Sequence, residues 1–134
     1  MTTRTTGSFT FADWQESVVA GDEGGPRLAH AVVTNAFTGG IEAQGTRCVY
    51  AISYADDATG VFTGYETCTG TVDGRQGSFV LREWGTFDKE GTHCSFEVLP
   101  GSGTDGLAGL RGTGGFTAVH GTKSIPYAFD VEWA

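Results

Sequence analysis

The sequence predicts an all-β protein, a single domain over residues 1–134 folded as an eight-stranded antiparallel up-and-down β-barrel with little helix. No long segment keeps apolar residues at helical spacing, whereas short runs of alternating apolar and polar residues recur along the chain. Gly, Asp and Pro separate these runs, and the connections are short, as in consecutive hairpins. Eight antiparallel strands in such a meander hide their edges when the sheet closes.

The alternating runs place the strands in order along the chain. GDEGGP separates the first strand from the second, and ADDATG, DGRQG and DKEG are predicted as hairpin turns further on. The last strand carries an apolar face that begins at Tyr127 and ends at Trp133, opposed by Asp130 and Glu132. The expected strands are residues 6–18, 28–38, 41–54, 61–72, 78–87, 93–99, 112–119 and 125–133.

The segment GSGTDG, residues 101–106, has the G-x-G-x-x-G spacing with which dinucleotide-binding proteins bind phosphate. In those proteins the glycines lead into a helix within a βαβ unit. Here the chain continues LAGLRGTGGF, in which four glycines would each weaken a helix by about 1 kcal/mol relative to alanine. The sequence therefore predicts a tight loop between two strands, with one helical turn at residues 107–110, and no nucleotide cofactor.

The hairpin over residues 61–87 is predicted to carry two carboxyl groups on its apolar face, Glu66 on the first strand and Glu83 on the second. Whether the turn falls at residues 73–74 or 75–76, paired positions sum to an odd number, so Glu66 lies diagonal to Glu83 in both registers. Diagonal neighbours have Cα atoms about 7–8 Å apart. We therefore expect the two carboxyl groups inside the barrel, within roughly 8 Å of each other.

Glu66 and Glu83 are accordingly the candidate catalytic residues. Burial raises the pKa of a carboxyl group, and a second carboxylate nearby raises one pKa of the pair further, so that one can act as an acid and the other as a base. The structural alternative is that either glutamate bonds backbone donors or an interior arginine, or lies at the rim in water. Arg82 is not such a partner, since alternation places it on the opposite face.

Other side chains are predicted to surround a pocket without taking part in chemistry. The strand over residues 48–54 leaves open which set of residues faces inward, and the bulkier set is favoured. His30 and His120 are predicted as ordinary surface or hydrogen-bonded histidines. The expected pocket-lining residues are Tyr50, Ile52, Tyr54, Phe62, Leu81, Phe96, Tyr127 and Phe129.

The net charge bears on the kinds of partner, and the cysteine content bears on the redox state of the thiols. The net charge is -8, with eight scattered Lys and Arg residues and no basic stripe, which argues against nucleic acid and anionic membranes as partners. The N-terminal residues show no apolar segment typical of a secretory signal. Cys48, Cys68 and Cys94 are odd in number and widely spaced, which favours buried free thiols in a reducing cytoplasm over disulfides or a metal site.

The runs GYETCTGTVDGRQGSFVLREWGTF and VLPGSGTDGLAGLRGTGGF resemble a bacterial family, number three-two-two-four of the domain-of-unknown-function series. Trp14 and Glu16 match the Trp and Glu of that family's first strand, and Glu66 matches its Gly-x-Glu position. Many members carry His at the position of Glu83. The family resembles the allene oxide cyclase barrel, which is related in shape to dirigent proteins, and this resemblance implies an apolar cavity and a possible homo-oligomer.

Two functions follow as expectations. The first is a small-molecule pocket protein of the barrel-cyclase type, which binds an apolar, lipid- or polyketide-like metabolite and isomerises or cyclises it by proximity and orientation without a cofactor. The alternative is a non-enzymatic ligand carrier or an oligomeric interaction module whose barrel is packed with side chains. An eight-stranded barrel is just wide enough for either, so the interior volume distinguishes them.

Overall fold

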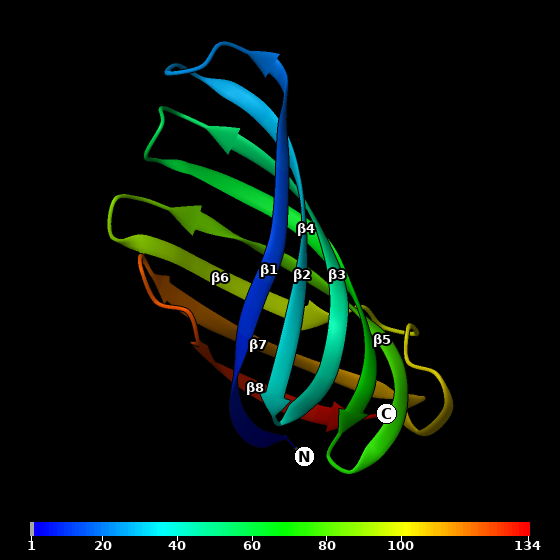
Figure 1. The fold of residues 1–134 in the computed structure, drawn as a ribbon. Helices are drawn as coiled ribbons and strands as arrows, with labels where there is room; N and C mark the ends of the chain where they lie inside the picture. The colour runs from blue at the N-terminus through cyan, green and yellow to red at the C-terminus, as the bar shows by residue number, and fades with distance from the viewer. Residues whose placement is uncertain (1) are drawn as a thin grey trace.

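The computed structural model describes residues 2–134 as a closed barrel of eight antiparallel strands (Figure 1). Each strand pairs with its neighbours along the chain, and β8 pairs with β1 to close the sheet. The predicted all-β fold is confirmed. The strands are β1 (Thr3–Gly21), β2 (Arg27–Gly39), β3 (Ile41–Tyr54), β4 (Gly60–Val72), β5 (Arg75–Phe87), β6 (Gly91–Val98), β7 (Leu110–Val119) and β8 (Ile125–Trp133).

The loop between β6 and β7 contains a 3₁₀ turn, η1 (Asp105–Leu107), the one helical element among residues 2–134. The sequence placed this turn slightly later, at residues 107–110. Leu110 instead opens β7, where its buried side chain is the first to point inward. The GSGTDG motif thus joins two antiparallel strands. None of the helices in the described part of the chain has the length and apolar character needed to cross a membrane.

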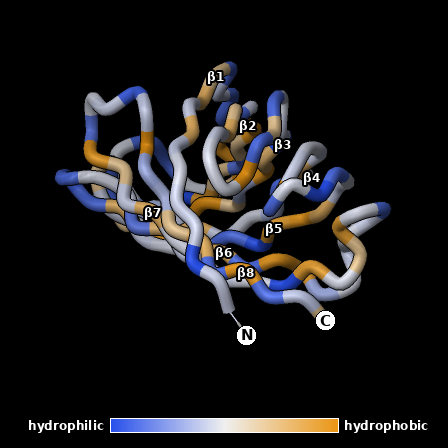
Figure 2. Tube along the Cα trace, turned by 90° about the horizontal axis from the view of Figure 1, so that it is seen from below, coloured by the Kyte–Doolittle hydropathy of each residue, from blue (hydrophilic) through white to orange (hydrophobic). Residues whose placement is uncertain are grey.

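Burial alternates along most strands, because successive side chains point to opposite faces of the sheet. In β4, for example, Glu66 and Cys68 are buried while Tyr65, Thr67 and Thr69 are exposed. Figure 2 shows the same alternation of hydrophobic and hydrophilic residues along the trace. The barrel interior is therefore built from every second residue.

A β-bulge in β1 and another in β3 change which residues face the interior near the site. The pairing of β1 with β2 shifts next to Asp13, which has φ 58°, and Phe11 and Trp14, three positions apart, line one cavity. The pairing of β3 with β4 shifts between Ala43 and Arg47, and Ala43 and Thr46 are both buried. Each bulge adds one residue to its strand and so reverses the inward parity. Beyond the β3 bulge, the bulky set that contains Tyr50 and Ile52 faces inward, as favoured from the sequence.

The interior has a packed half and an open half. The packed half holds a cluster of aromatic and aliphatic side chains, among them Phe79, Phe96 and Phe129. Both termini lie near one end of the barrel (Figure 1). A smaller cluster from β2 and β3 lines the other half. There β1 pairs with β8 only as far as Phe9 opposite Ile125, and the rest of β1 pairs with β2 alone. This separation of β1 from β8 opens the barrel on one side.

Candidate functional site

The β4–β5 hairpin aligns the two glutamates. Val72 pairs with Arg75, so Asp73 and Gly74 form the turn, and both have positive φ, 53° and 74°. Positive φ at both central residues is the type I′ geometry, whose twist matches that of a hairpin. This is one of the two registers that the sequence allowed.

In this register Glu66 pairs with Leu81, and Glu83 pairs with Gly64, so the two glutamates are diagonal neighbours. Their side chains are 1% and 2% exposed. One oxygen from each carboxyl group and the Sγ atom of Cys48 all lie within 4.8 Å of one another. The diagonal placement inside the barrel is as the turn predicted; a catalytic role for the pair stays a prediction.

Glu83 is bound by a tyrosine that reaches it across β4. The Tyr50 hydroxyl donates a hydrogen bond of 3.0 Å to Oε1 of Glu83. Tyr50 and Glu83 both pair with Gly64, from opposite sides of β4. A Cβ atom on Gly64 would lie 2.8 Å from Cδ1 of Tyr50 and 2.3 Å from the Val49 carbonyl oxygen. The absence of a side chain at Gly64 therefore lets the Tyr50 ring lie over the strand.

Glu66 is bound from the other side by β2 and β3. Nδ2 of Asn35 donates a hydrogen bond of 2.8 Å to Oε2 of Glu66, and the Thr46 hydroxyl donates to the same oxygen. Asn35 and Thr46 are a cross-strand pair, and both are buried. Two donors on one carboxyl oxygen satisfy its hydrogen-bonding capacity and offset part of the cost of burial.

The surroundings favour a proton on Glu83. Burial, the negative charge of Glu66 and a hydrogen bond with Glu66 raise the pKa of Glu83 well above its usual range, against the opposing hydrogen bond from Tyr50. Burial and the charge of Glu83 likewise raise the pKa of Tyr50. The site thus joins in a row a phenol and a carboxyl group whose pKa values are both raised and a second carboxyl group with two donors.

Two thiols complete the shell around Glu83. Sγ of Cys48 lies 3.8 Å from Oε2 of Glu83, and Sγ of Cys94 lies 3.9 Å from Oε1. Burial raises the pKa of both thiols, so they are weak donors here and not thiolates. Cys48, Glu66 and Glu83 are the group among the described residues whose atoms are close enough to hold a metal ion. Hydrogen bonds from Tyr50, Asn35 and Thr46 already engage those carboxyl oxygens.

A cavity of about 650 Å³ occupies the open half of the barrel and ends at this polar row. Asn35 and Tyr50 belong to its lining, whereas Glu66 and Glu83 lie behind them. The walls are mainly aromatic and aliphatic, and the charged residues lie near the hairpin ends. The lining includes Phe9, Phe11, Trp14, Val33, Ile52, Tyr54, Phe62, Phe87, Phe116, Ala118 and Ile125, with Asp57, Asp88, Lys89 and His120 at the rim.

The projecting part of β1 forms one wall of this cavity. The Trp14 ring lies 6.0 Å from the Tyr50 ring, centroid to centroid, and its indole N–H donates a hydrogen bond of 3.0 Å to Glu16. The Tyr54 hydroxyl donates to the other Glu16 oxygen. Burial and this hydrogen bond raise the pKa of Tyr54 to about 12. Of the two residues that carried the resemblance in the first strand, Trp14 thus lines the cavity, and Glu16 bonds two of its lining residues.

The residues that the sequence predicted to line the pocket divide between the open half and the packed half of the barrel. Tyr50, Ile52, Tyr54 and Phe62 line the cavity. Leu81, Phe96, Tyr127 and Phe129 lie instead in the packed half. There the rings fill the barrel, as the 5.7 Å between the centroids of Phe96 and Phe129 shows. The sequence pattern distinguishes inward-facing from outward-facing residues, but it does not indicate which half of the barrel is packed with side chains.

The sequence analysis missed Asn35 and Thr46. Asn35 interrupts an inward-facing series of β2 that otherwise holds Ala31, Val33 and Phe37, and this polar residue among apolar ones was a usable signal. Thr46 carried no such signal, because its inward position depends on the β3 bulge. Both partners of Glu66 come from strands outside the hairpin on which the pair was recognised.

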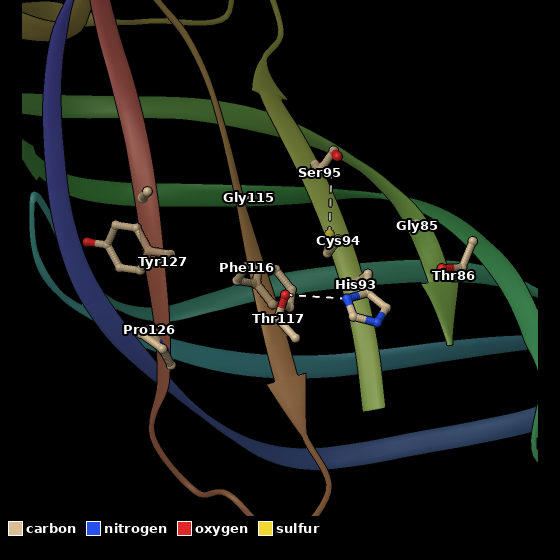
Figure 3. A pocket seen from close by; sticks show the side chains of 11 residues that line it. Gly85, Thr86, His93, Cys94, Ser95, Gly115, Phe116, Thr117, Pro126 and Tyr127 are labelled. Atoms are coloured by element: carbon tan, nitrogen blue, oxygen red, sulfur yellow. Dashed lines mark hydrogen bonds between the residues drawn. The ribbon is translucent and has the colours of Figure 1, made fainter. Parts of the chain in front are cut away.

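A second depression, of about 680 Å³, lies on the outer face of β5–β8, where Gly115 has no side chain (Figure 3). His93 and Thr117 point toward each other there, with 3.4 Å between Nδ1 and Oγ1. Apart from His93, its lining carries no charged or titratable side chain turned to this surface. The interior cavity, which is backed by the carboxyl pair, is therefore the better candidate site.

Comparison with known proteins agrees with this barrel. Residues 5–131 match the family described as a protein of unknown function, DUF3224. The chain belongs to the DUF3224 family. A solved DUF3224 structure, a protein of unknown function from Shewanella oneidensis MR-1, is similar to this chain with a TM-score of 0.78 and 27% identity, covering 100% of this chain and 99% of the other. No curated protein matches this DUF3224 chain. The family predicted from the central motifs is confirmed.

Proposed function

We propose that the protein binds a small apolar molecule in the interior cavity and acts on it as an isomerase or cyclase without a cofactor. The observation that carries the proposal is the contact of this apolar cavity with Tyr50, whose hydroxyl is bonded to the buried Glu83–Glu66 pair. A cavity of about 650 Å³ is within the usual range for small-molecule sites. The eight-stranded closed barrel also supports the proposed likeness to the allene oxide cyclase and dirigent barrels.

Tyr50 is the group placed to meet a ligand, because Glu66 and Glu83 lie behind the cavity wall. Its hydroxyl can turn toward a ligand oxygen while the proton on Glu83 turns toward Tyr50, which stabilises negative charge as it develops on that oxygen. The negative charge of Glu66 opposes a second negative charge on Glu83 and so favours the protonated form of Glu83. Isomerisation and cyclisation conserve the atoms and the overall oxidation state of the ligand, so this row of groups and a folded ligand suffice.

Binding in the cavity can be tested with the neutral fluorescent probe N-phenyl-1-naphthylamine. We expect saturable binding with one site per chain. Ala118→Trp should weaken it at least tenfold, because Ala118 lines the cavity and a Trp there would fill it. Ala51→Trp is the matched control, since Ala51 is exposed on the outer face of β3. If Ala118→Trp binds the probe as well as Ala51→Trp does, the cavity is not the binding site.

A ligand carrier is the second candidate, because every buried side-chain oxygen and nitrogen of the described residues already has a hydrogen-bond partner within the protein. The two functions differ in what becomes of the ligand. For an enzyme, incubation with a lipid extract followed by chromatography and mass spectrometry should reveal isomers of unchanged mass. Glu66→Gln, which removes the charge and keeps the size, should still bind but should form no isomers. Recovery of only unchanged ligands from both proteins would establish the carrier.

A further inference from the structure

The charges around the cavity differ between its floor and its rim. At the floor, Asn35 and Tyr50 separate the cavity from the Glu66–Glu83 pair, which holds at least one negative charge. Among the described residues that line the cavity, Lys89 is the one Lys or Arg, and it lies at the rim beside Asp88.

The remaining charged groups near the cavity are also acidic or already paired. Asp57 at the rim accepts a hydrogen bond of 2.9 Å from Arg27, whose guanidinium also stacks 3.9 Å from the centroid of the Tyr54 ring. Glu16 on β1 accepts hydrogen bonds from Trp14 and Tyr54. A carboxylate ligand that reached the floor would therefore meet buried negative charge and no cation, at a large cost in a low-dielectric interior.

The floor nevertheless keeps hydrogen-bonding capacity for a neutral group. Asn35 uses one amide hydrogen for Glu66, which leaves its second hydrogen and its side-chain oxygen. The Tyr50 oxygen keeps its lone pairs while its hydrogen bonds Glu83. A ligand hydroxyl or carbonyl can thus be accommodated there, next to walls that accept only apolar groups.

We infer that the ligand is a neutral, largely apolar compound whose hydroxyl or carbonyl group lies at the floor between Asn35 and Tyr50, and that fatty-acid-like anions are excluded. This inference rests on the proposed function and specifies its substrate class. The cavity of about 650 Å³ has the size of a small-molecule site.

The charge selection is tested by displacing N-phenyl-1-naphthylamine at pH 8 with three ligands of equal chain length, decan-1-ol, decan-2-one and decanoate. We expect the alcohol and the ketone to bind at least tenfold more tightly than decanoate. If decanoate binds as tightly as decan-1-ol, the inference is overturned. It is overturned even if Lys89→Ala abolishes decanoate binding, which would show that decanoate binds at the rim.

The position of the polar group is tested with Tyr50→Phe, which keeps the ring and removes the hydroxyl. The variant should bind decan-1-ol and decan-2-one about three- to tenfold more weakly, the effect of one neutral hydrogen bond. Tyr65→Phe on the exposed outer face is the control and should change nothing. Unchanged decan-1-ol binding by Tyr50→Phe overturns the inference.

These outcomes separate the inference from the proposed function. If the wild-type protein binds the probe but prefers decanoate, only the inferred ligand class is contradicted. The same holds if Tyr50→Phe leaves the binding of decan-1-ol unchanged. A wild-type protein that binds neither the probe nor any of the three ligands contradicts the proposed function, and the inference with it.

Discussion

Glu83 is more completely buried than an isolated, charged carboxyl group could be. Tyr50 donates to it at 3.0 Å, the thiols of Cys48 and Cys94 lie next to it, and Glu66 is its closest charged neighbour. These contacts suit a protonated carboxyl group that accepts a hydrogen bond from Tyr50 and donates one to Glu66. A buried pair of this kind reduces stability when both members are charged.

Glu83→Gln should therefore stabilise the barrel at alkaline pH. Because the folded pKa of Glu83 is raised, the folded state binds more protons than the unfolded state above the ordinary glutamate pKa of about 4.3, so stability falls as the pH rises through the folded pKa. Gln has the shape of the protonated acid and does not titrate. At pH 8 we expect an unfolding free energy above that of the wild type, because the wild-type protein has lost the stability that the proton on Glu83 supplies at lower pH.

Chemical denaturation at pH 5 and at pH 8 measures this effect, and the difference between the two proteins should shrink at pH 5. Glu97→Gln is the matched control, because Glu97 lies on the outer face with Arg82 and its side chain is 37% exposed. A Glu83→Gln protein that is less stable than the wild type at both pH values would show that Glu83 is needed as an anion.

At the scale of elements, the β4–β5 hairpin depends on its turn. Asp73 and Gly74 both have positive φ, which costs an L-residue other than Gly roughly 1–2 kcal/mol. No atom lies within 4 Å of the position that a Cβ on Gly74 would take, so a larger residue there is opposed by backbone conformation and not by contact. The turn sets the register that makes Glu66 and Glu83 diagonal neighbours.

Gly74→Ala should accordingly lower the unfolding free energy by about 1–2 kcal/mol without a change in cavity binding. Asp73→Asn is the control at the neighbouring position and should be neutral or slightly stabilising, because Asn-Gly is the favoured type I′ pair. Urea denaturation measures both variants. Equal stability of Gly74→Ala and the wild type would mean that the turn tolerates another geometry and does not hold the register.

The bulges are the other decisive elements. The β1 bulge turns Trp14 toward the cavity that Phe9 and Phe11 also line, and the β3 bulge turns Thr46 toward Glu66. Without a bulge, strict alternation would place Thr46 on the face opposite Ala43. The residue inserted next to Asp13 in β1 therefore supplies a cavity wall, and the residue inserted in β3 supplies a carboxylate partner.

At the scale of the whole molecule, closure divides the barrel into its two halves. Pairing of β1 with β8 ends at Phe9 opposite Ile125, and the packed cluster of aromatic residues lies on the side where the barrel is closed. On the other side, β1 continues with β2 as its one partner, and small inward residues such as Ala29 and Ala31 leave the interior unfilled. The cavity is a consequence of unequal strand lengths and of side-chain volume.

The sequence by itself determined the local features of this protein. The alternation of β3 and β8 gave their bounds, and the DGRQG turn was enough to place Glu66 diagonal to Glu83, because hairpin register depends on residues close together in the chain. The sequence motif of the same hairpin, GYETCTGTVDGRQGSFVLREWGTF, also helped to indicate the family.

Only the tertiary structure decided what surrounds the pair. Asn35 and Thr46 meet Glu66 through pairings between other strands and through a bulge that no local pattern revealed. Phe62 lines a cavity whereas Phe129 is packed, although both lie on apolar faces of alternating strands. The physical reason is that alternation depends on the backbone of one strand, whereas the filling of the interior depends on the volumes of side chains from all eight strands and on where β1 and β8 meet.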